Sequence, residues 1–296
     1  MRLGLIVLLC LVNAGCAIVR KDAEEPVDNT PRTAKAEPEL KPSEVLQPKS
    51  LRIASPITDR FYMRGTYFPA AVTTEIRLDP NSSLPGTLLS AEDDLGLDDQ
   101  VDQGRMEFDI RLAERNHVRV DYFKLNRFHE APLAESIIFG DFIFPAGTNF
   151  RAKLDWRVLT LTYTRSVFRT ERFEGGLGLG IHIIEAHASG GTPGTLNFEE
   201  TDEVGIFPTI AANLAFRISK RWSVTARGQQ FSASPEDFDG TMRDYHADVQ
   251  YRWRDNFAFG LGYSLLESNL DVFDPDEPLL FNLKTEGPEV FFRVSF

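Results

Sequence analysis

Residues 289–296 alternate between apolar and polar side chains with a period of two, a pattern that fits a β-strand and does not form one face of a helix. The apolar members are Val290, Phe292, Val294 and Phe296, the polar members are Glu289, Arg293 and Ser295, and Phe291 is the exception. A soluble domain seldom leaves such a strand at an edge, because an unpaired apolar edge promotes aggregation. A closed barrel in a membrane pairs this strand with the first one and turns its apolar face to lipid. The pattern therefore favours a membrane barrel over its alternative, a strand of a soluble sandwich.

The same alternation recurs between residues 60 and 296, in segments of about ten residues. Short turns and long polar loops separate these segments alternately, which is typical of barrels in the bacterial outer membrane. We expect an all-β fold, namely a transmembrane antiparallel β-barrel of about ten strands, with eight or twelve as alternatives. The first strand is expected at residues 70–78, the short turns at 114–116, 169–172, 219–221 and 254–256, and the long loops at 81–99, 130–147, 189–194, 233–240 and 271–277.

Along each strand we expect the apolar side chains to face lipid and the polar ones to face the lumen. Val72, Thr74 and Ile76 are thus expected to face outward, as are Phe150, Ala152, Leu154 and Trp156. The phase of the alternation slips at residues 158–159, so a β-bulge is expected there. An aromatic girdle at the headgroup level is expected to contain Trp156, Trp222, Trp253, Tyr163, Tyr251 and Tyr263.

Composition narrows the classes of function. A net charge of -12 and a pI near 5.0 argue against nucleic acid as a partner. Both cysteines, Cys10 and Cys16, lie in the leader, which leaves no cysteine-based metal site in the barrel. We expect no cofactor.

The N-terminal residues predict export. Residues 1–17 read as a signal peptide, in which Ala14-Gly15-Cys16 resembles a lipobox with Cys16 as the lipidated residue. Asn13 stands where lipoproteins usually carry Leu, so ordinary signal-peptidase cleavage is the alternative. Residues 18–59 are rich in Pro, Glu and Lys and are expected to form a disordered tether in the periplasm, or else a docking segment for a periplasmic partner.

The inward positions carry charges of both signs, which we expect to pair across neighbouring strands. A lumen of about ten strands is narrow enough for side chains to fill, so a closed interior is expected, with a narrow solute path as the alternative. The predicted ion-pair network comprises Glu75, Arg77, Arg105, Glu107, Asp109, Arg111, Arg119, Asp121, Arg151, Asp155 and Arg252.

One His lies between two carboxylates on the same strand face, in the sequence Asp244-Tyr-His246-Ala-Asp248. A carboxylate that orients an imidazole produces a general base, so these three residues are the candidates for catalysis. Omptin proteases use such acid and His pairs, and lipid A deacylases pair a His with a Ser, for which Ser223 or Ser264 is available. A lumen is polar throughout, however, so a neighbouring His and Asp also arise by chance.

Acidic loop residues form the weak candidates for metal binding. Asp93, Asp94, Asp98 and Asp99 concentrate oxygen ligands in one loop, but their spacing does not match an EF-hand. A solvated loop that shares divalent ions with lipopolysaccharide phosphates is the simpler interpretation.

Four segments carry a family resemblance: residues 86–99, residues 139–145, residues 237–240 and the end of the sequence at 292–296. Together they resemble a group of proteobacterial outer-membrane β-barrel proteins that has no assigned reaction or ligand. The resemblance covers about residues 60–296 and implies fold and location but no functional residue. The terminal Phe296 resembles the last residue of bacterial outer-membrane barrels in general, which implies that the barrel-assembly machinery reads it. We expect outer-membrane lipid and lipopolysaccharide as the other partners. The lipobox-like Cys16 and the long tether depart from the group.

We expect a monomer in the bacterial outer membrane with its tether in the periplasm. The expected role is non-enzymatic, either envelope-structural or porin-like passage of a small solute. The alternative is an outer-membrane hydrolase, of the lipid A deacylase or omptin type, that uses the lumen His.

Overall fold

A computed structural model describes residues 55–78, 86–139, 141–195, 198–234, 238–272 and 279–296. The chain divides into two units, Met1–Arg52 and Ile53–Phe296, and the second contains every described residue. The predicted signal peptide, the lipidation candidate Cys16 and the tether up to residue 54 lie outside the described residues. No helix in the described segments is long and apolar enough to cross a membrane.

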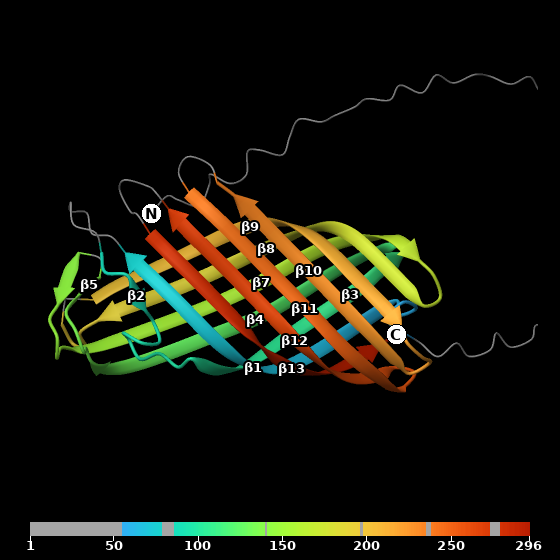
Figure 1. Ribbon diagram of the computed structural model, residues 1–296, viewed down its shortest axis with the longest axis horizontal. Coiled ribbons are helices and arrows are strands. Elements are labelled where there is room, and N and C mark those ends of the chain that lie inside the picture. Colours follow the sequence, from blue (N-terminus) through green and yellow to red (C-terminus); the bar gives the residue numbers. More distant parts are fainter. Residues whose placement is uncertain (1–54, 79–85, 140, 196–197, 235–237, 273–278) are drawn as a thin grey trace, which may run out of the picture. The chain divides into compact units, whose positions relative to one another are not determined.

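Ten long antiparallel strands form a closed barrel in which β13 pairs with β1 (Figure 1). The short β2 pairs with β1, and β5 and β6 form a separate hairpin. The strands are β1 (Phe61–Leu78), β2 (Leu89–Ser90), β3 (Gln100–Ala113), β4 (Asn116–Pro132), β5 (Ile137–Phe139), β6 (Phe142–Phe144), β7 (Asn149–Arg169), β8 (Phe173–Gly191), β9 (Phe198–Arg217), β10 (Trp222–Ala233), β11 (Phe238–Arg254), β12 (Phe257–Val272) and β13 (Leu279–Ser295). The predicted fold class is confirmed, although β1 begins earlier than the expected residue 70.

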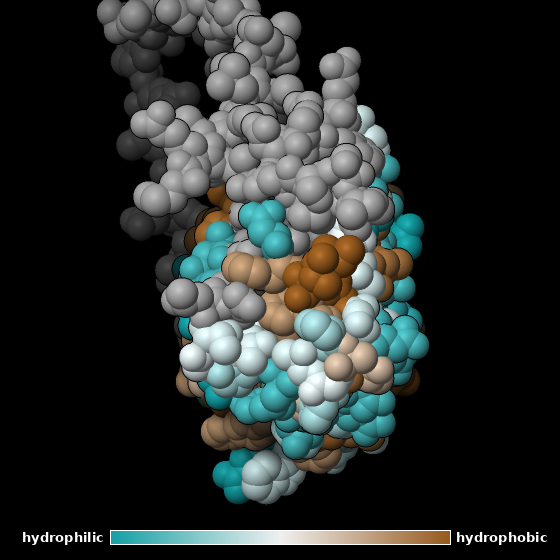
Figure 2. Space-filling model, turned by 90° about the vertical axis from the view of Figure 1, so that its left-hand side faces the viewer, coloured by the Kyte–Doolittle hydropathy of each residue, from teal (hydrophilic) through white to brown (hydrophobic). Residues whose placement is uncertain are grey.

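The two ends of the barrel differ in their connections. Short turns join β3 to β4, β7 to β8, β9 to β10 and β11 to β12 at one end, which we call the turn end. The start of β1 and the end of β13 lie there too, where the Phe296 amide donates a hydrogen bond to the Phe61 carbonyl at 2.8 Å. The longer connections lie at the opposite end, the loop end. In Figure 2, which views the loop end, hydrophilic residues cover much of the coloured surface.

The outer surface changes from apolar to charged near one level along the strands, with exposed Phe128 on β4 and Val204 on β9 as exceptions. On β7, Leu159 is the last exposed apolar residue towards the loop end, and Arg157 is the first exposed charged one. Their partners directly across on β4, Tyr122 and Lys124, show the same change. We call the two sides of this level the turn half and the loop half. The exposed apolar belt of the turn half includes Phe108, Ile110, Leu161, Leu179, Ile181, Ile210, Leu214, Val249, Phe259, Leu261, Val290 and Phe292.

The lumen shows largely the reverse arrangement: charged side chains are buried in the turn half, and most buried side chains of the loop half are apolar, with the ion pair of Arg127 and Glu92 as an exception. The buried apolar residues of the loop half form one cluster, which we call the lumen apolar cluster. It includes Phe68, Val72, Ile76, Leu89, Phe123, Leu125, Ile137, Phe139, Phe144, Phe150, Ala152, Leu154, Trp156, Val158, Ile184, Met242, Leu266, Phe281 and Leu283.

The expected side-chain orientation is therefore wrong in the loop half. Val72, Thr74, Ile76, Phe150, Ala152, Leu154 and Trp156 are buried in the lumen, whereas Thr73, Glu75, Arg151, Lys153, Asp155 and Arg157 face outward. The physical reason is the surrounding medium: strands that extend beyond the lipid are in water, so their apolar side chains are buried inside. The predicted bulge is wrong as well, because Val158 and Leu159 pair with Phe123 and Tyr122 without a register shift.

The aromatic girdle needs one correction. Trp222, Trp253, Tyr163 and Tyr263 are exposed, and Tyr251 is half-buried. Trp156 instead lies in the lumen, where its ring stacks on Phe281 with centroids 5.0 Å apart. Its position in the loop half places it above the lipid-facing level.

Lumen crowding explains a glycine in β8. A Cβ atom at Gly180 would lie 2.1 Å from Oε1 of Gln229 and 2.6 Å from the Thr209 hydroxyl. Gln229 accepts hydrogen bonds from Thr209 and from Thr162 across the lumen. The glycine thus makes room for lumen side chains.

Candidate functional site in the barrel lumen

Glu107 on β3 is the central acid of the buried charged network. Nη1 of Arg227 on β10 lies 2.7 Å from its carboxylate, Nε of Arg119 on β4 lies 4.0 Å away, and the Tyr62 hydroxyl donates a hydrogen bond to it. Arg105 is 3.5 Å from Asp121, which also faces Arg227. Charged side chains from β3, β4 and β10 and the Tyr62 hydroxyl from β1 therefore meet in one connected set.

Arg64 on β1 connects this set to the last strands. Its Nη1 donates to Asp248 at 2.7 Å, and its Nη2 pairs with Glu289. The guanidinium also lies over the Phe291 ring, 3.6 Å from the centroid. Phe291, the exception in the alternation of residues 289–296, thus faces inward and serves as the platform for a buried cation.

The candidate catalytic residues lie within this network. His246 is 4% exposed, and Asp244 and Asp248 are 8% and 5% exposed. The His246 Nε2 atom lies 2.8 Å from Asp244 and 2.5 Å from Nη1 of Arg105. His182 reaches Asp244 from β8 at 3.5 Å.

The two candidate serines are buried too. Ser264 lies directly across from His246 in the β11–β12 pair. Ser223 accepts a hydrogen bond from Gln250 at 3.0 Å. The acid and His arrangement is thus built into the packed interior, away from either barrel rim.

The turn end of the lumen is covered by residues 55–59, which the sequence had assigned to the tether. Ser55, Ile57 and Asp59 are buried. Arg252 and Arg293 both donate to Asp59, at 2.6 and 2.8 Å. This short segment is therefore part of the barrel, and the tether prediction is wrong for it.

Arg111 fixes the same segment from β3. It donates to the carbonyls of Ile57 and Asp59 at 2.9 and 3.1 Å. It also binds both carboxylate oxygens of Glu174, at 2.8 and 2.9 Å. His117 stands between Asp109 and Glu174, at 3.1 and 3.4 Å.

The residues predicted to form the ion-pair network fall into two groups, according to the half of the barrel in which they lie. Arg105, Glu107, Asp109, Arg111, Arg119, Asp121 and Arg252 are buried in the lumen. Glu75, Arg151 and Asp155 lie on the outer face of the loop half, and Arg77 shares the face of Glu75, so their assignment to the lumen is wrong. Sequence reasoning missed Arg64 and Tyr62, because the first strand was expected to start at residue 70.

The lumen apolar cluster closes the loop half. The β5–β6 hairpin contributes Phe139 and Phe144, whose rings contact that of Phe150 edge-on with centroids 6.2 and 5.0 Å away. Below them Trp156 and Phe281 stack across the lumen. Aromatic side chains from the hairpin and the wall thus fill the space between the strands.

A group of candidate metal ligands lies outside the lumen. Within the described part of the chain, the group whose donor atoms come together is His187, Glu200 and Asp202. The acidic loop candidates Asp93, Asp94, Asp98 and Asp99 are exposed and belong to no such group there. Asp94 instead accepts a hydrogen bond from the Ser90 amide at 2.8 Å.

No protein-family model matches the sequence, and no curated protein matches it significantly. Among solved structures, the outer membrane protease OmpT from Escherichia coli has a TM-score of 0.45 at 8% identity, covering 80% of this chain and 96% of that one. The transport unit of the autotransporter AIDA-I from E. coli has a TM-score of 0.39 at 10% identity, with coverages of 87% and 93%. The toluene transporter TodX from Pseudomonas putida scores 0.35 at 8% identity, with coverages of 82% and 93%. At TM-scores below 0.5, these likenesses carry no inference about function.

Location follows from the barrel itself. A closed sheet satisfies its backbone hydrogen bonds internally, and its apolar belt matches the hydrocarbon region of a bilayer. The chain is an outer-membrane β-barrel protein. Short turns at one end and longer loops at the other are the usual arrangement of such barrels.

Proposed function

We propose that this barrel is a non-enzymatic, envelope-structural protein that does not conduct solutes. The filled lumen supports the proposal: the ion-pair network occupies the turn half, and the lumen apolar cluster occupies the loop half. Residues 55–59 add a third obstruction at the turn end. A solute path would have to cross a salt-bridged layer and an apolar layer in succession, which suits neither ions nor apolar molecules.

Conductance in planar bilayers tests this proposal against the alternative of narrow solute passage. The purified full chain should insert without giving steady single-channel current, while a general porin inserted under the same conditions serves as the positive control. Insertion is checked by the heat-dependent shift in gel mobility and by protease protection. A reproducible unitary current from the inserted protein would contradict the proposal and favour the narrow pore.

The burial of His246 also favours a non-enzymatic role. A general base must come within hydrogen-bonding reach of its substrate, about 2.6–3.2 Å. His246 is enclosed by Arg105, Asp244 and Glu289, which supply its polar contacts. Mass spectrometry of lipid A from cells that carry the wild type or His246→Ala tests the deacylase form of the alternative. Identical profiles are expected, and a difference that tracks the substitution would support the hydrolase.

We further propose that the partners are outer-membrane lipid, lipopolysaccharide and the barrel-assembly machinery, the last through Phe296. Lys124 and Arg157 lie directly opposite each other on the outer face, at the level where the apolar belt ends. Cations at this level are placed to meet lipopolysaccharide phosphates. Lipopolysaccharide should copurify with the wild type and less with the Lys124→Glu, Arg157→Glu double variant. Equal amounts would contradict this contact.

A further inference from the structure

We propose that His187, Glu200 and Asp202 form a binding site for a divalent transition-metal ion of the zinc class on the outer face of β8 and β9. The site lies apart from the lumen, and its cation is bound by one imidazole nitrogen and two carboxylate oxygens. It does not depend on the function proposed above.

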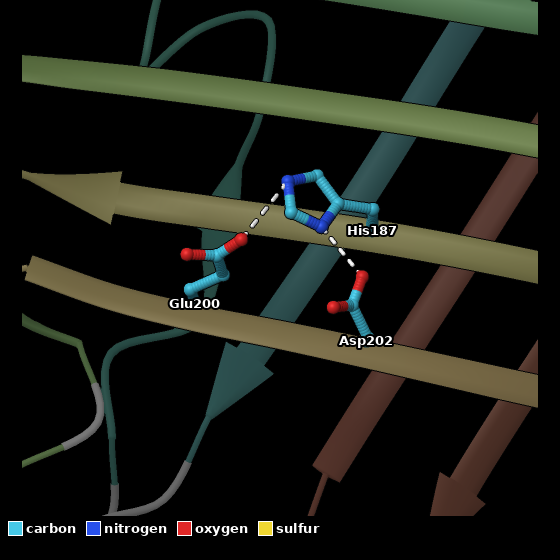
Figure 3. A group of neighbouring side chains, drawn as sticks. All are labelled: His187, Glu200 and Asp202. Atoms are coloured by element: carbon cyan, nitrogen blue, oxygen red, sulfur yellow. Dashed lines mark hydrogen bonds and ion pairs between the residues drawn. The ribbon is translucent and has the colours of Figure 1, made fainter.

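Strand pairing brings these ligands together. His187 and Asp202 are direct cross-strand partners, and Glu200 is two residues further along β9, opposite Ser189. All three side chains project from the outer surface. Figure 3 shows the His187 ring facing both carboxylates. Because the β8–β9 ladder fixes the backbone spacing, the three ligands are held on one side of the sheet without help from a loop.

The distances suit a single ion. Nδ1 of His187 lies 2.6 Å from Oδ1 of Asp202, and its Nε2 lies 3.7 Å from Oε1 of Glu200 (Figure 3). One donor atom from each residue lies within 4.8 Å of the others. Zinc binds nitrogen and carboxylate oxygen at about 2.0–2.2 Å. The two carboxylates lie against different ring nitrogens, so binding of one ion through either nitrogen requires the other carboxylate to turn toward that nitrogen.

The donor set indicates the class of cation. Magnesium and calcium prefer oxygen ligands throughout, whereas imidazole suits zinc, copper and nickel. Glu200 and Asp202 are largely exposed, and His187 is partly exposed, so the ion has access from water and keeps water in its remaining positions.

A neighbouring ion pair lies beside the trio. Asp155 on β7 lies directly opposite His187 on its other side, paired with Lys153 at 2.8 Å. The trio also lies on the loop side of Glu185, the first charged residue beyond the apolar belt on β8. The site therefore faces the aqueous side of the lipid boundary, where dissolved cations reach it.

Isothermal titration of the folded full chain in detergent micelles with zinc chloride tests the proposal. One zinc ion per chain is expected for the wild type, and His187→Ala should weaken its binding by more than about tenfold, since loss of even an indirect partner of a metal ligand costs roughly 10–100-fold. Asp202→Asn should weaken binding in the same direction. Cobalt should give visible absorption bands in the wild type that are absent from His187→Ala.

Glu185→Gln is the matched control, because it removes one exposed carboxylate from the same face of β8 outside the trio. It should bind zinc like the wild type, and every variant should keep its heat-dependent gel shift. Equal zinc affinity in wild type and His187→Ala, or displacement of the ion by equimolar magnesium, would overturn the proposal. So would a loss in Glu185→Gln as large as that in His187→Ala, since that would indicate general attraction by surface charge.

Discussion

The turn half and the loop half of the barrel are built from the same continuous strands but bury opposite kinds of side chain. In the turn half, apolar side chains face outward and charged ones are paired in the lumen. In the loop half, most charged side chains face outward, and the lumen apolar cluster occupies the interior together with the ion pair of Arg127 and Glu92. The first half resembles a membrane protein and the second a water-soluble barrel, joined at the level of Leu159 and Arg157.

This difference shows that the medium outside each half determines which face of the sheet carries the apolar side chains. Along β7 every second residue from Phe150 to Ser166 faces the lumen, with no bulge at residues 158–159. The inward side chains change along that line from Phe150 and Leu154 to Thr160 and Thr164. Water outside one half and lipid outside the other account for the change.

The largest effect is expected from a charge placed in the apolar loop half of the lumen. Leu154→Arg adds a cation to the lumen apolar cluster directly across from Arg127, which already pairs with Glu92, and should destabilise the barrel by more than about 4 kcal/mol, or prevent folding. Leu161→Arg, on the lipid face of the same strand, should cost about 2–4 kcal/mol. Urea unfolding in liposomes measures both. If the Leu154 variant folded as stably as the wild type, the buried apolar layer would be refuted.

The second-largest effect is expected from removal of Glu107, the central acid of the lumen network. Glu107→Ala removes the nearest carboxylate of Arg227 and leaves this cation with Asp121 at 3.5 Å and Arg119 with Asp109 at 3.7 Å, so it should lower the free energy of unfolding by about 3–5 kcal/mol. The matched control is Glu75→Ala on the outer face of the loop half, where the expected loss is about 0–1 kcal/mol. Equal losses in the two variants would abolish the distinction between inner and outer charges.

A smaller effect is expected at the turn end. Asp59→Ala removes the acceptor shared by Arg252 and Arg293, with an expected cost of about 1–3 kcal/mol. Residues 55–59 should then leave the lumen more often, so trypsin should cleave faster after Arg60. Glu114→Gln, a change at an exposed residue of the same end, is the control. Cleavage at the wild-type rate in the Asp59 variant would show that other contacts retain the segment.

The smallest effect is expected from a substitution that tests where the lipid boundary lies. Lys153→Leu exchanges an exposed charge of the loop half for an apolar side chain, and should change stability by less than about 0.5 kcal/mol because water surrounds this level. The free energy of unfolding in liposomes is the measurement. A clear gain in stability would mean that lipid covers Lys153 and that the belt extends further than proposed.

Much of the fold could be predicted, because alternation, turn chemistry and loop length are local properties. The turn-half orientation of Phe108, Leu161 and Phe292 followed from them. The orientation of the loop half did not, since alternation defines two faces without saying which is buried. Every second residue from Leu154 to Thr160 faces the same side of β7. Without the assumed bulge at residues 158–159, this continuous alternation would have predicted the orientation of the loop half.

The candidate sites were harder to predict, because their members meet only through strand pairing. His246 was visible beside its carboxylates, but its enclosure by Arg105 depends on a contact between residues 141 positions apart. His187 and its acidic partners come from two strands whose register the sequence does not state. Residues 55–59 looked like tether because nothing nearby shows that Arg252 and Arg293 approach Asp59.

The contacts of Arg64 bear on how such a barrel is made. Its partners Asp248 and Glu289 are 184 and 225 positions away in sequence. The Arg64 cation can therefore be neutralised only after almost the entire chain has been synthesised and exported. A hairpin formed early from neighbouring strands does not contain its partners. High contact order of this kind slows folding. It also makes completion of the interior and joining of the first and last strands a single cooperative event, so that a half-assembled intermediate carries exposed charge that keeps it out of the bilayer.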